Sequence, residues 1–136
     1  MKEVTKIIEL QTNDASKKLL FATRYSVQIN FTFDLTAKSG DFSGTSHFCV
    51  QTDEIEAFCN ALMKMHVSLS GSARLGDNDS DGFVNLEMQE RGHLKVSGQI
   101  GDSHEGHYIT FEFLTDQTCI PPFVSDFKAL LNNQDN

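Results

Sequence analysis

The feature that most constrains the fold is a strict alternation of apolar and polar residues. It is clearest in residues 25–37, YSVQINFTFDLTA, where apolar side chains recur at every second position from Val27 to Leu35. Because successive side chains of a strand point to opposite faces of its sheet, this segment predicts one strand with a buried face and a wet face. One-sided burial is typical of antiparallel sheets, since parallel sheets are usually covered on both faces.

The same alternation returns in the second half of the chain. The strands that it predicts there cover residues 67–75, 84–88, 94–100 and 109–113. A further short strand is expected at 46–50, after a turn in which Gly40 and Gly44 can take positive φ. Consecutive strands with short connections predict an antiparallel meander.

Two other segments repeat apolar residues every three or four positions, which is the period of an amphipathic helix. The first helix is predicted at about residues 53–65, where Thr52 or Asp53 can cap it and Glu56 has capping-box spacing. The second is predicted at about residues 121–132, because its two prolines suit the first turn of a helix.

These elements predict an α+β fold with a mainly antiparallel sheet. About seven strands are expected, either in one strongly curled sheet or in a two-layer β-sandwich, together with the two helices. The chain has 136 residues, so a single domain over residues 1–136 is predicted. Apolar residues make up 39% of the chain, which suffices for a hydrophobic core without disulfides.

An acidic loop, residues 77–82, is the first candidate for a site. Asp77, Asp79 and Asp81 occupy the first, third and fifth positions of an EF-hand calcium loop, and a glycine occupies the sixth. The bidentate Glu needed at the twelfth position is replaced by Met88, and strands rather than helices are predicted on both sides. We therefore interpret the loop as a solvated hairpin turn, with calcium binding by the three aspartates as the weaker alternative.

His104 and His107, in the segment HEGH, are the other candidate metal ligands. A zinc-protease helix needs two residues between H-E and the second His, whereas this segment has one, a glycine. The serines of DFSGTS and LSGSAR do not match the nucleophile elbow of hydrolases. The sequence therefore predicts no catalytic residue, no metal site and no cofactor.

The charge of the chain restricts its partners. A formal net charge of −8 is repelled by phosphate backbones and anionic lipids, so nucleic acid and membranes are not expected partners. The charge suits a basic protein partner, or it serves solubility alone. Three cysteines without paired spacing indicate a reducing compartment, and the chain shows no secretory signal, so a cytoplasmic location is predicted.

Four segments in order carry a resemblance to a known family. They are FTFDLTAKSGDFSG, DEIEAFCNAL, GHLKVSGQI and FEFLTDQTCIPPFVSDFKALL, and they run from Phe31 to Leu131. They resemble the WapI-type immunity proteins, small bacterial proteins associated with neutralising the toxic tips of contact-delivered toxins. The more specific marks of the resemblance are Phe42-Ser43-Gly44, Gly92-His93 and Asp116-Gln117-Thr118.

These marks have structural interpretations. Gly44 and Gly92 are expected to form turns, and Phe42 is expected to pack. Asp116 or Thr118 is expected to hydrogen-bond the free amides where the last helix begins.

Two functions from different classes follow. The first is a non-catalytic immunity protein that occludes a basic toxin domain, with Asp77, Asp79 and Asp81 as the candidate contact residues. The second is a small-ligand-binding or enzymatic α+β domain, for which a deep pocket between sheet and helices would be the mark. The sequence leaves open whether the protein forms a homodimer.

Overall fold

The computed structural model describes residues 6–133, in which the chain runs twice through four strands and a helix. The first unit contains β1 (Ile7–Glu9), β2 (Lys17–Val27), β3 (Asn30–Ser39), β4 (Phe42–Gln51) and α1 (Thr52–Ser68). The second unit contains β5 (Ser72–Gly76), β6 (Phe83–Met88), β7 (His93–Asp102), β8 (His107–Asp116) and α2 (Ile120–Asn132). Three 3-10 turns, at residues 90–92, 103–105 and 117–119, precede β7, β8 and α2.

Each unit forms one four-stranded antiparallel sheet whose strands pair in chain order. We call β1–β4 the first sheet and β5–β8 the second sheet. The predicted α+β class with antiparallel pairing is confirmed. Within residues 6–133 the strands number eight rather than about seven, and they form two separate sheets rather than one strongly curled sheet.

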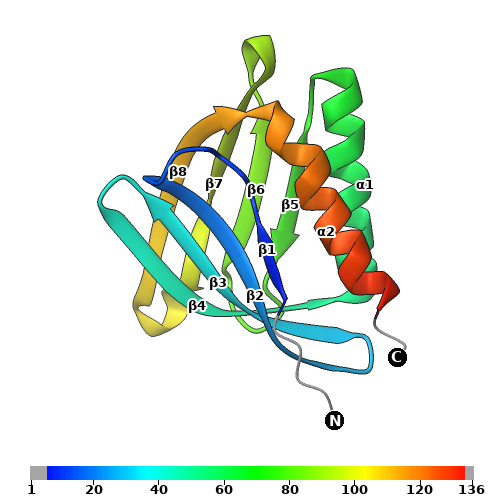
Figure 1. Ribbon diagram of the computed structural model, residues 1–136. Coiled ribbons are helices and arrows are strands. Elements are labelled where there is room, and N and C mark those ends of the chain that lie inside the picture. The colour runs from blue at the N-terminus through cyan, green and yellow to red at the C-terminus, as the bar shows by residue number, and fades with distance from the viewer. Residues whose placement is uncertain (1–5, 134–136) are drawn as a thin grey trace.

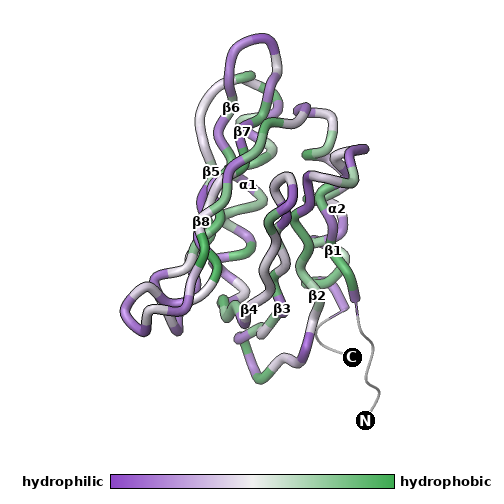
Figure 2. Tube along the Cα trace, turned by 90° about the vertical axis from the view of Figure 1, so that its left-hand side faces the viewer, coloured by the Kyte–Doolittle hydropathy of each residue, from purple (hydrophilic) through white to green (hydrophobic). Residues whose placement is uncertain are grey.

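Both sheets turn one face toward a shared hydrophobic core. Figure 1 shows α1 and α2 lying side by side against the two sheets, and Figure 2 shows the second sheet standing beside the first. Six phenylalanine rings fill the centre of the core: Phe21, Phe33, Phe48, Phe58, Phe123 and Phe127. They meet mostly edge to face, the favourable geometry for aromatic pairs, so the first sheet and both helices are joined by one aromatic cluster.

The strand predicted at residues 25–37 is wrong in its extent. The chain reverses at Gln28 and Ile29, and β2 and β3 pair on either side of this two-residue turn. Gln28 has a φ of 58°, a left-handed conformation that a hairpin turn of this length requires. As a result Val27 and Ile29 are exposed, whereas Phe31 and Phe33 are buried as predicted.

Both helices are confirmed, but α1 is longer than predicted and begins earlier. It starts at Thr52, and Glu54 accepts a hydrogen bond from the Gln51 backbone N–H (2.9 Å), so the capping residues are not those predicted. The helix continues to Ser68, which removes Val67 and Leu69 from the predicted strand at 67–75 and leaves both exposed. Within residues 6–133, no helix combines the length and apolar character needed to cross a bilayer.

The structural expectations for the residues that mark the family resemblance are only partly confirmed. Gly92 has a φ of +76° and Asp116 accepts a hydrogen bond from the Thr118 N–H (2.9 Å), so both expectations are confirmed. Gly44 instead lies within β4, where a Cβ would stand 2.7 Å from Ile109 Cδ1, so its function is close packing rather than a turn. The expectation that Phe42 packs is wrong, because its side chain is 80% exposed beside the β3–β4 turn.

Candidate functional site

The acidic loop is a hairpin connection that lies along the edge of β4. It joins the antiparallel pair β5 and β6, as predicted, and Asp77 N–H donates to the Gly82 carbonyl (2.9 Å). Asp77 Oδ1 accepts the Cys49 N–H and the Cys49 carbonyl accepts the Asn78 N–H, each at 2.9 Å. Because unpaired strand edges are open to pairing with other chains, the loop protects β4 by occupying both backbone groups of Cys49.

Hydrogen bonds inside the loop hold it in one conformation. The Asp77 carboxylate accepts a bond from the Asp79 N–H (3.1 Å) and another from the Ser80 hydroxyl (2.6 Å). The Ser80 oxygen in turn accepts the Gly82 N–H (3.0 Å). Short side chains that satisfy neighbouring amides in this way fix turns. Asp77 is therefore a structural residue of the loop and of the β4 edge.

Asp81 anchors the other end of the loop to β7 and to the turn that follows it. Its carboxylate accepts bonds from Gln99 Nε2 (2.6 Å), from the Ser103 N–H (2.9 Å) and from the Ser103 hydroxyl. The bonds from Ser103 are the main reason that the pKa of Asp81 is lowered to about 2. Asp81 is thus ionised at neutral pH and committed to the fold.

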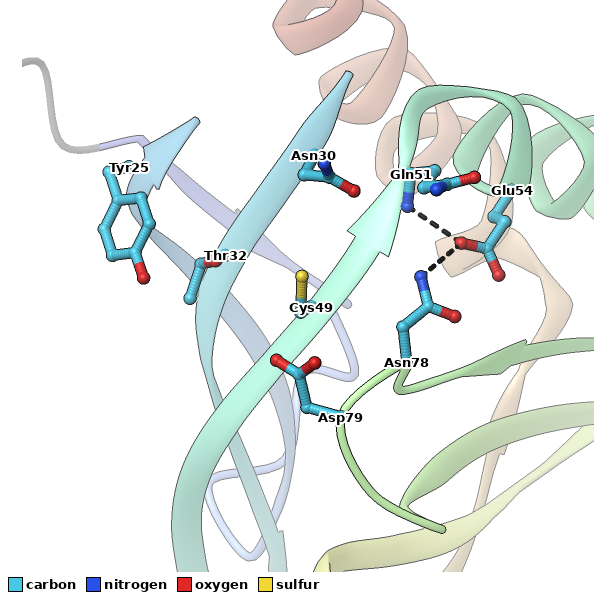
Figure 3. A pocket seen from close by; sticks show the side chains of 8 residues that line it. All are labelled: Tyr25, Asn30, Thr32, Cys49, Gln51, Glu54, Asn78 and Asp79. Atoms are coloured by element: carbon cyan, nitrogen blue, oxygen red, sulfur yellow. Dashed lines mark hydrogen bonds between the residues drawn. The ribbon is translucent and has the colours of Figure 1, made fainter. Parts of the chain in front are cut away.

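A pocket of about 470 Å³ lies where the acidic loop meets the outer face of the first sheet, the face turned away from the core (Figure 3). It is lined by Tyr25, Asn30, Thr32, Cys49, Gln51, Glu54, Asn78 and Asp79. The lining includes two carboxylates, three amides and two hydroxyl groups, and none of the eight residues is Lys, Arg or His. The pocket therefore favours a cationic group that donates hydrogen bonds.

A β-bulge places the aromatic residue of this pocket. The pairing of β2 with β3 shifts between Thr23 and Tyr25, so Tyr25 pairs with Thr32 instead of falling on the core face. Thr32 pairs in turn with Cys49, and the three side chains stand next to each other across β2, β3 and β4. If the pairing continued from Thr23 without the bulge, Tyr25 would fall on the core face of the sheet.

The two carboxylates of the pocket differ in their bonding. Glu54 Oε1 accepts bonds from the Gln51 N–H (2.9 Å) and from Asn78 Nδ2 (2.7 Å), so it joins the start of α1 to the acidic loop. Within residues 6–133 the Asp79 carboxylate accepts no hydrogen bond and forms no ion pair, and its side chain is exposed. Figure 3 shows it pointing toward the Cys49 sulfur. Asp79 is the carboxylate that is available to a partner.

Cys49 is unsuited to nucleophilic chemistry in this pocket. Burial raises the pKa of its thiol, and the negative charges of Asp79 and Asp77 raise it further. A thiol must lose its proton to act as a nucleophile, and here the proton is retained at neutral pH. The negative charge that stabilises the thiol form also favours a cation in the same place.

Large apolar side chains are exposed beside the pocket, on the hairpin that joins β2 and β3. Tyr25, Val27 and Ile29 have exposed fractions of 59%, 58% and 52%. We call these three residues the apolar tip. Exposed apolar groups that adjoin a polar cavity are typical of surfaces that bind other proteins, so the tip and the pocket form one candidate surface.

The structure does not bring together either set of candidate metal ligands that the sequence suggested, the three loop aspartates or the two histidines. His104 lies with Asp81 and Asp102, and their ligand atoms fall within 4.8 Å of one another, whereas His107 and the other loop aspartates do not belong to this group. One oxygen of Asp102 already accepts the His104 N–H (2.9 Å), and Asp81 is bonded to Ser103. Most of the available oxygens therefore already have partners, and the cluster is explained by the turn that it stabilises.

The comparison with protein families shows which family the chain belongs to. Residues 10–134 match the model of the immunity protein WapI-like family. The chain belongs to this family. Of the marks quoted from the sequence, His93 pairs with Asp116 across β7 and β8, and Gln117 packs beside Gly92. These family marks therefore meet at one end of the second sheet, away from the pocket.

Other comparisons concern the fold alone. No curated protein matches the sequence significantly. Among solved structures, the chain is similar to one in the crystal structures of Trypanosoma brucei MRP1/MRP2, with a TM-score of 0.53 over 100% of this chain and 90% of that chain. The sequences are 6% identical, so this likeness extends to the arrangement of strands and helices.

Most residues of the pocket were missed by sequence reasoning. Only Asp79 was a candidate, while the other seven lining residues come from β2, β3, β4, the start of α1 and the acidic loop. A signal was present for Asn30 and Thr32, which occupy polar positions of the alternating pattern. No local pattern indicates Tyr25, because a bulge places it, and Glu54 was missed because the helix cap was assigned to Thr52 or Asp53.

Proposed function

We propose that this protein is an immunity protein that binds a cognate bacterial toxin and blocks it by occlusion, without a reaction of its own. Membership of the WapI-like immunity family is the observation that carries the proposal. The pocket and the apolar tip support it, because they offer a partner protein both polar and apolar contacts on one face. The three free cysteines suit action in the reducing cytoplasm.

The proposed partner is a basic toxin domain. A toxin that acts on nucleic acid must bind phosphates, and proteins do so with clefts rich in Lys and Arg. A protein with a net charge of −8 is attracted to such a cleft, and long-range attraction accelerates association. Occlusion of the cleft would then suffice to protect the cell.

Within the acidic loop we assign the partner contact to Asp79. Asp77 and Asp81 are bonded inside the protein, so we give them the role of holding the loop in place. This division refines the expectation that all three aspartates touch the toxin.

The test is co-expression with the toxin domain encoded beside this gene. We expect growth to be rescued, and the two proteins to co-purify as a complex whose affinity falls as salt is raised. Rescue by a chain that makes no complex would point to another mechanism. If neither rescue nor a complex is found, the proposed function is wrong.

A second candidate is a small-ligand-binding or enzymatic domain. The volume of the pocket, about 470 Å³, lies within the roughly 300–1,000 Å³ of ligand sites. This function predicts that a cationic metabolite raises the melting temperature by mass action, with a response that saturates. A panel of amines and guanidines without any effect, together with a stable toxin complex, would exclude it.

A further inference from the structure

We propose that the pocket between the acidic loop and the first sheet is the receptor for one arginine side chain of the toxin, with Asp79 as its ion-pair partner. This inference rests on the proposed function and adds the recognition chemistry to it. The occupant is a guanidinium group presented by a protein, and the apolar tip packs against the residues that flank it.

The charge of the pocket selects a cation. Glu54 and Asp79 are the only carboxylates among its lining residues, and the lining contains no Lys, Arg or His. The Asp79 carboxylate has no internal partner within the described residues, so it loses no bond when a ligand arrives. Burial is the main cause that raises the pKa of Cys49, and the negative charges of Asp79, Asp77 and Glu54 raise it further.

The number and spread of hydrogen-bond acceptors favour guanidinium over ammonium. Side-chain oxygens of Asn30 and Thr32 line the cavity along with the Asp79 carboxylate, so acceptors come from β3 and from the acidic loop. A guanidinium group has five N–H donors fixed in a plane, whereas an ammonium group is a compact point charge with three. Its donors lie on three nitrogens, so it reaches separated oxygens and a carboxylate over a wider span than an ammonium group does.

The aromatic ring beside the pocket adds to this preference. Tyr25 stands at the rim, between the cavity and the exposed Val27 and Ile29. Guanidinium groups stack on aromatic faces, and the stem of an arginine is apolar enough to lie against such residues. The protein itself shows this preference elsewhere, since the Arg74 guanidinium lies 3.9 Å over the Phe83 ring.

The receptor is formed before the partner arrives. The acidic loop is fixed by bonds to Cys49, Ser80 and Ser103, and Asn78 is fixed by Glu54. A preformed site loses little conformational freedom on binding, so a greater part of the contact energy appears as affinity.

The first experiment uses a probe that does not depend on the toxin. N-acetyl-arginine-amide is titrated into the 15N-labelled full chain, and amide shifts are followed by NMR. We expect saturable shifts at Thr32, Cys49 and Asn78 with a dissociation constant of about millimolar, and markedly weaker shifts with N-acetyl-lysine-amide. Equal responses to both probes, or no saturable response to arginine, would overturn the proposal.

The variants are Asp79→Asn and a matched control, Asp41→Asn. Asp79 makes no internal bond with its side chain, so its amide variant retains the fold. Asp41 lies in the exposed β3–β4 turn, roughly 30 Å along the strands from the pocket, and the substitution removes the same charge. We expect Asp79→Asn to abolish the arginine response and Asp41→Asn to preserve it.

The same variants are then measured against the toxin domain. Asp79→Asn is expected to weaken the complex by about tenfold or more, because a charge-assisted hydrogen bond is lost, while Asp41→Asn changes the affinity less than about twofold. Tyr25→Ala should weaken it as well, with Tyr108→Ala on β8 as its control for an exposed tyrosine.

The outcomes separate the two proposals. If the wild-type protein binds the toxin and Asp79→Asn binds equally well, the arginine receptor is wrong and the immunity function stands. If the wild-type protein does not bind the toxin, the immunity function is wrong, and the arginine titration still tests the pocket by itself.

Discussion

The two units share the same order of elements, yet their first loops behave differently. In the first unit, the β1–β2 connection hydrogen-bonds to its own unit, as in the bonds of Ser16 with Asp14 and Gly40. In the second unit, the corresponding β5–β6 connection is the acidic loop, which crosses to the other unit and covers Cys49 on β4. The pocket lies where this loop contacts β4. The candidate site is therefore formed by the part of the second unit that differs from the first.

The units also differ in how they build the core. The rings of the first sheet contact rings of α2, as Phe21 contacts Phe123 and Phe127. In the second sheet, the ring of Phe111 meets Phe113 of the same strand. The first sheet therefore depends on a helix from the other unit, and the molecule should unfold as one body.

The largest expected effect tests this dependence. Phe21→Ala should lower the free energy of unfolding by about 3–5 kcal/mol, because Phe21 is fully buried among four other rings. The same substitution at Phe111, which is 9% exposed, should cost clearly less. Urea denaturation with probes in both sheets should show one transition for each variant. Equal losses, or separate transitions of the sheets, would contradict the difference between the units.

The second effect concerns two glycines within strands. A Cβ on Gly98 of β7 would stand 2.2 Å from the Phe83 carbonyl oxygen, and backbone cannot move aside easily. Gly98→Ala should therefore cost about 1–3 kcal/mol. The contact at Gly44 of β4 is the flexible end of Ile109, so Gly44→Ala should cost less. Chemical denaturation of both variants measures this, and a larger loss at Gly44 would reverse the assignment.

The third effect separates the aspartates of the acidic loop. Asp77→Ala leaves the Cys49 N–H without its acceptor and should cost about 1–3 kcal/mol. Hydrogen exchange at the Cys49 amide should accelerate as well. Asp79→Ala, two residues away, should change stability by less than about 0.5 kcal/mol. Equal losses of stability in both variants would contradict the assignment of a structural role to Asp77 and a free side chain to Asp79.

The smallest effect appears in acid and again compares the two first loops. The pKa of Asp81 lies below its unfolded value, so its contribution to stability is present above about pH 4 and is lost as pH falls toward 2. The pKa of Asp14 is also lowered, chiefly by Ser16, but this partner is two residues away and remains near in the unfolded chain. In Asp81→Asn, the urea midpoint should therefore change less between pH 4 and pH 2 than it does in the wild-type protein. Asp14→Asn should leave this pH dependence nearly unchanged.

The sequence predicted most of the elements, because local periodicity decides them. The strands β6, β7 and β8 and both helices follow their apolar patterns closely. The β2–β3 turn was missed because the alternation continues through Val27, Ile29 and Phe31 without a break. Only the positive φ of Gln28 marks the reversal, and glutamine is not a residue that announces it.

The candidate site was harder to predict because it is assembled by distant contacts. Asp81 was visible as part of an acidic repeat, but its partner Ser103 stands 22 residues further along the chain. Nothing in the sequence relates Cys49 to the acidic loop, yet the loop bonds to its backbone. Charge and spacing in a sequence identify a loop, whereas the direction in which it folds depends on the tertiary structure.

The commitment of Asp77 and Asp81 to internal bonds has an evolutionary consequence. Under the proposed function, the protein must follow a toxin that diverges, and a contact surface whose residues all changed freely would lose its shape. Here Asp79 lies between the two bonded ends of the loop and its side chain makes no internal bond, so this position can change at little risk to folding. Diversification within the family should therefore concentrate between the two anchors.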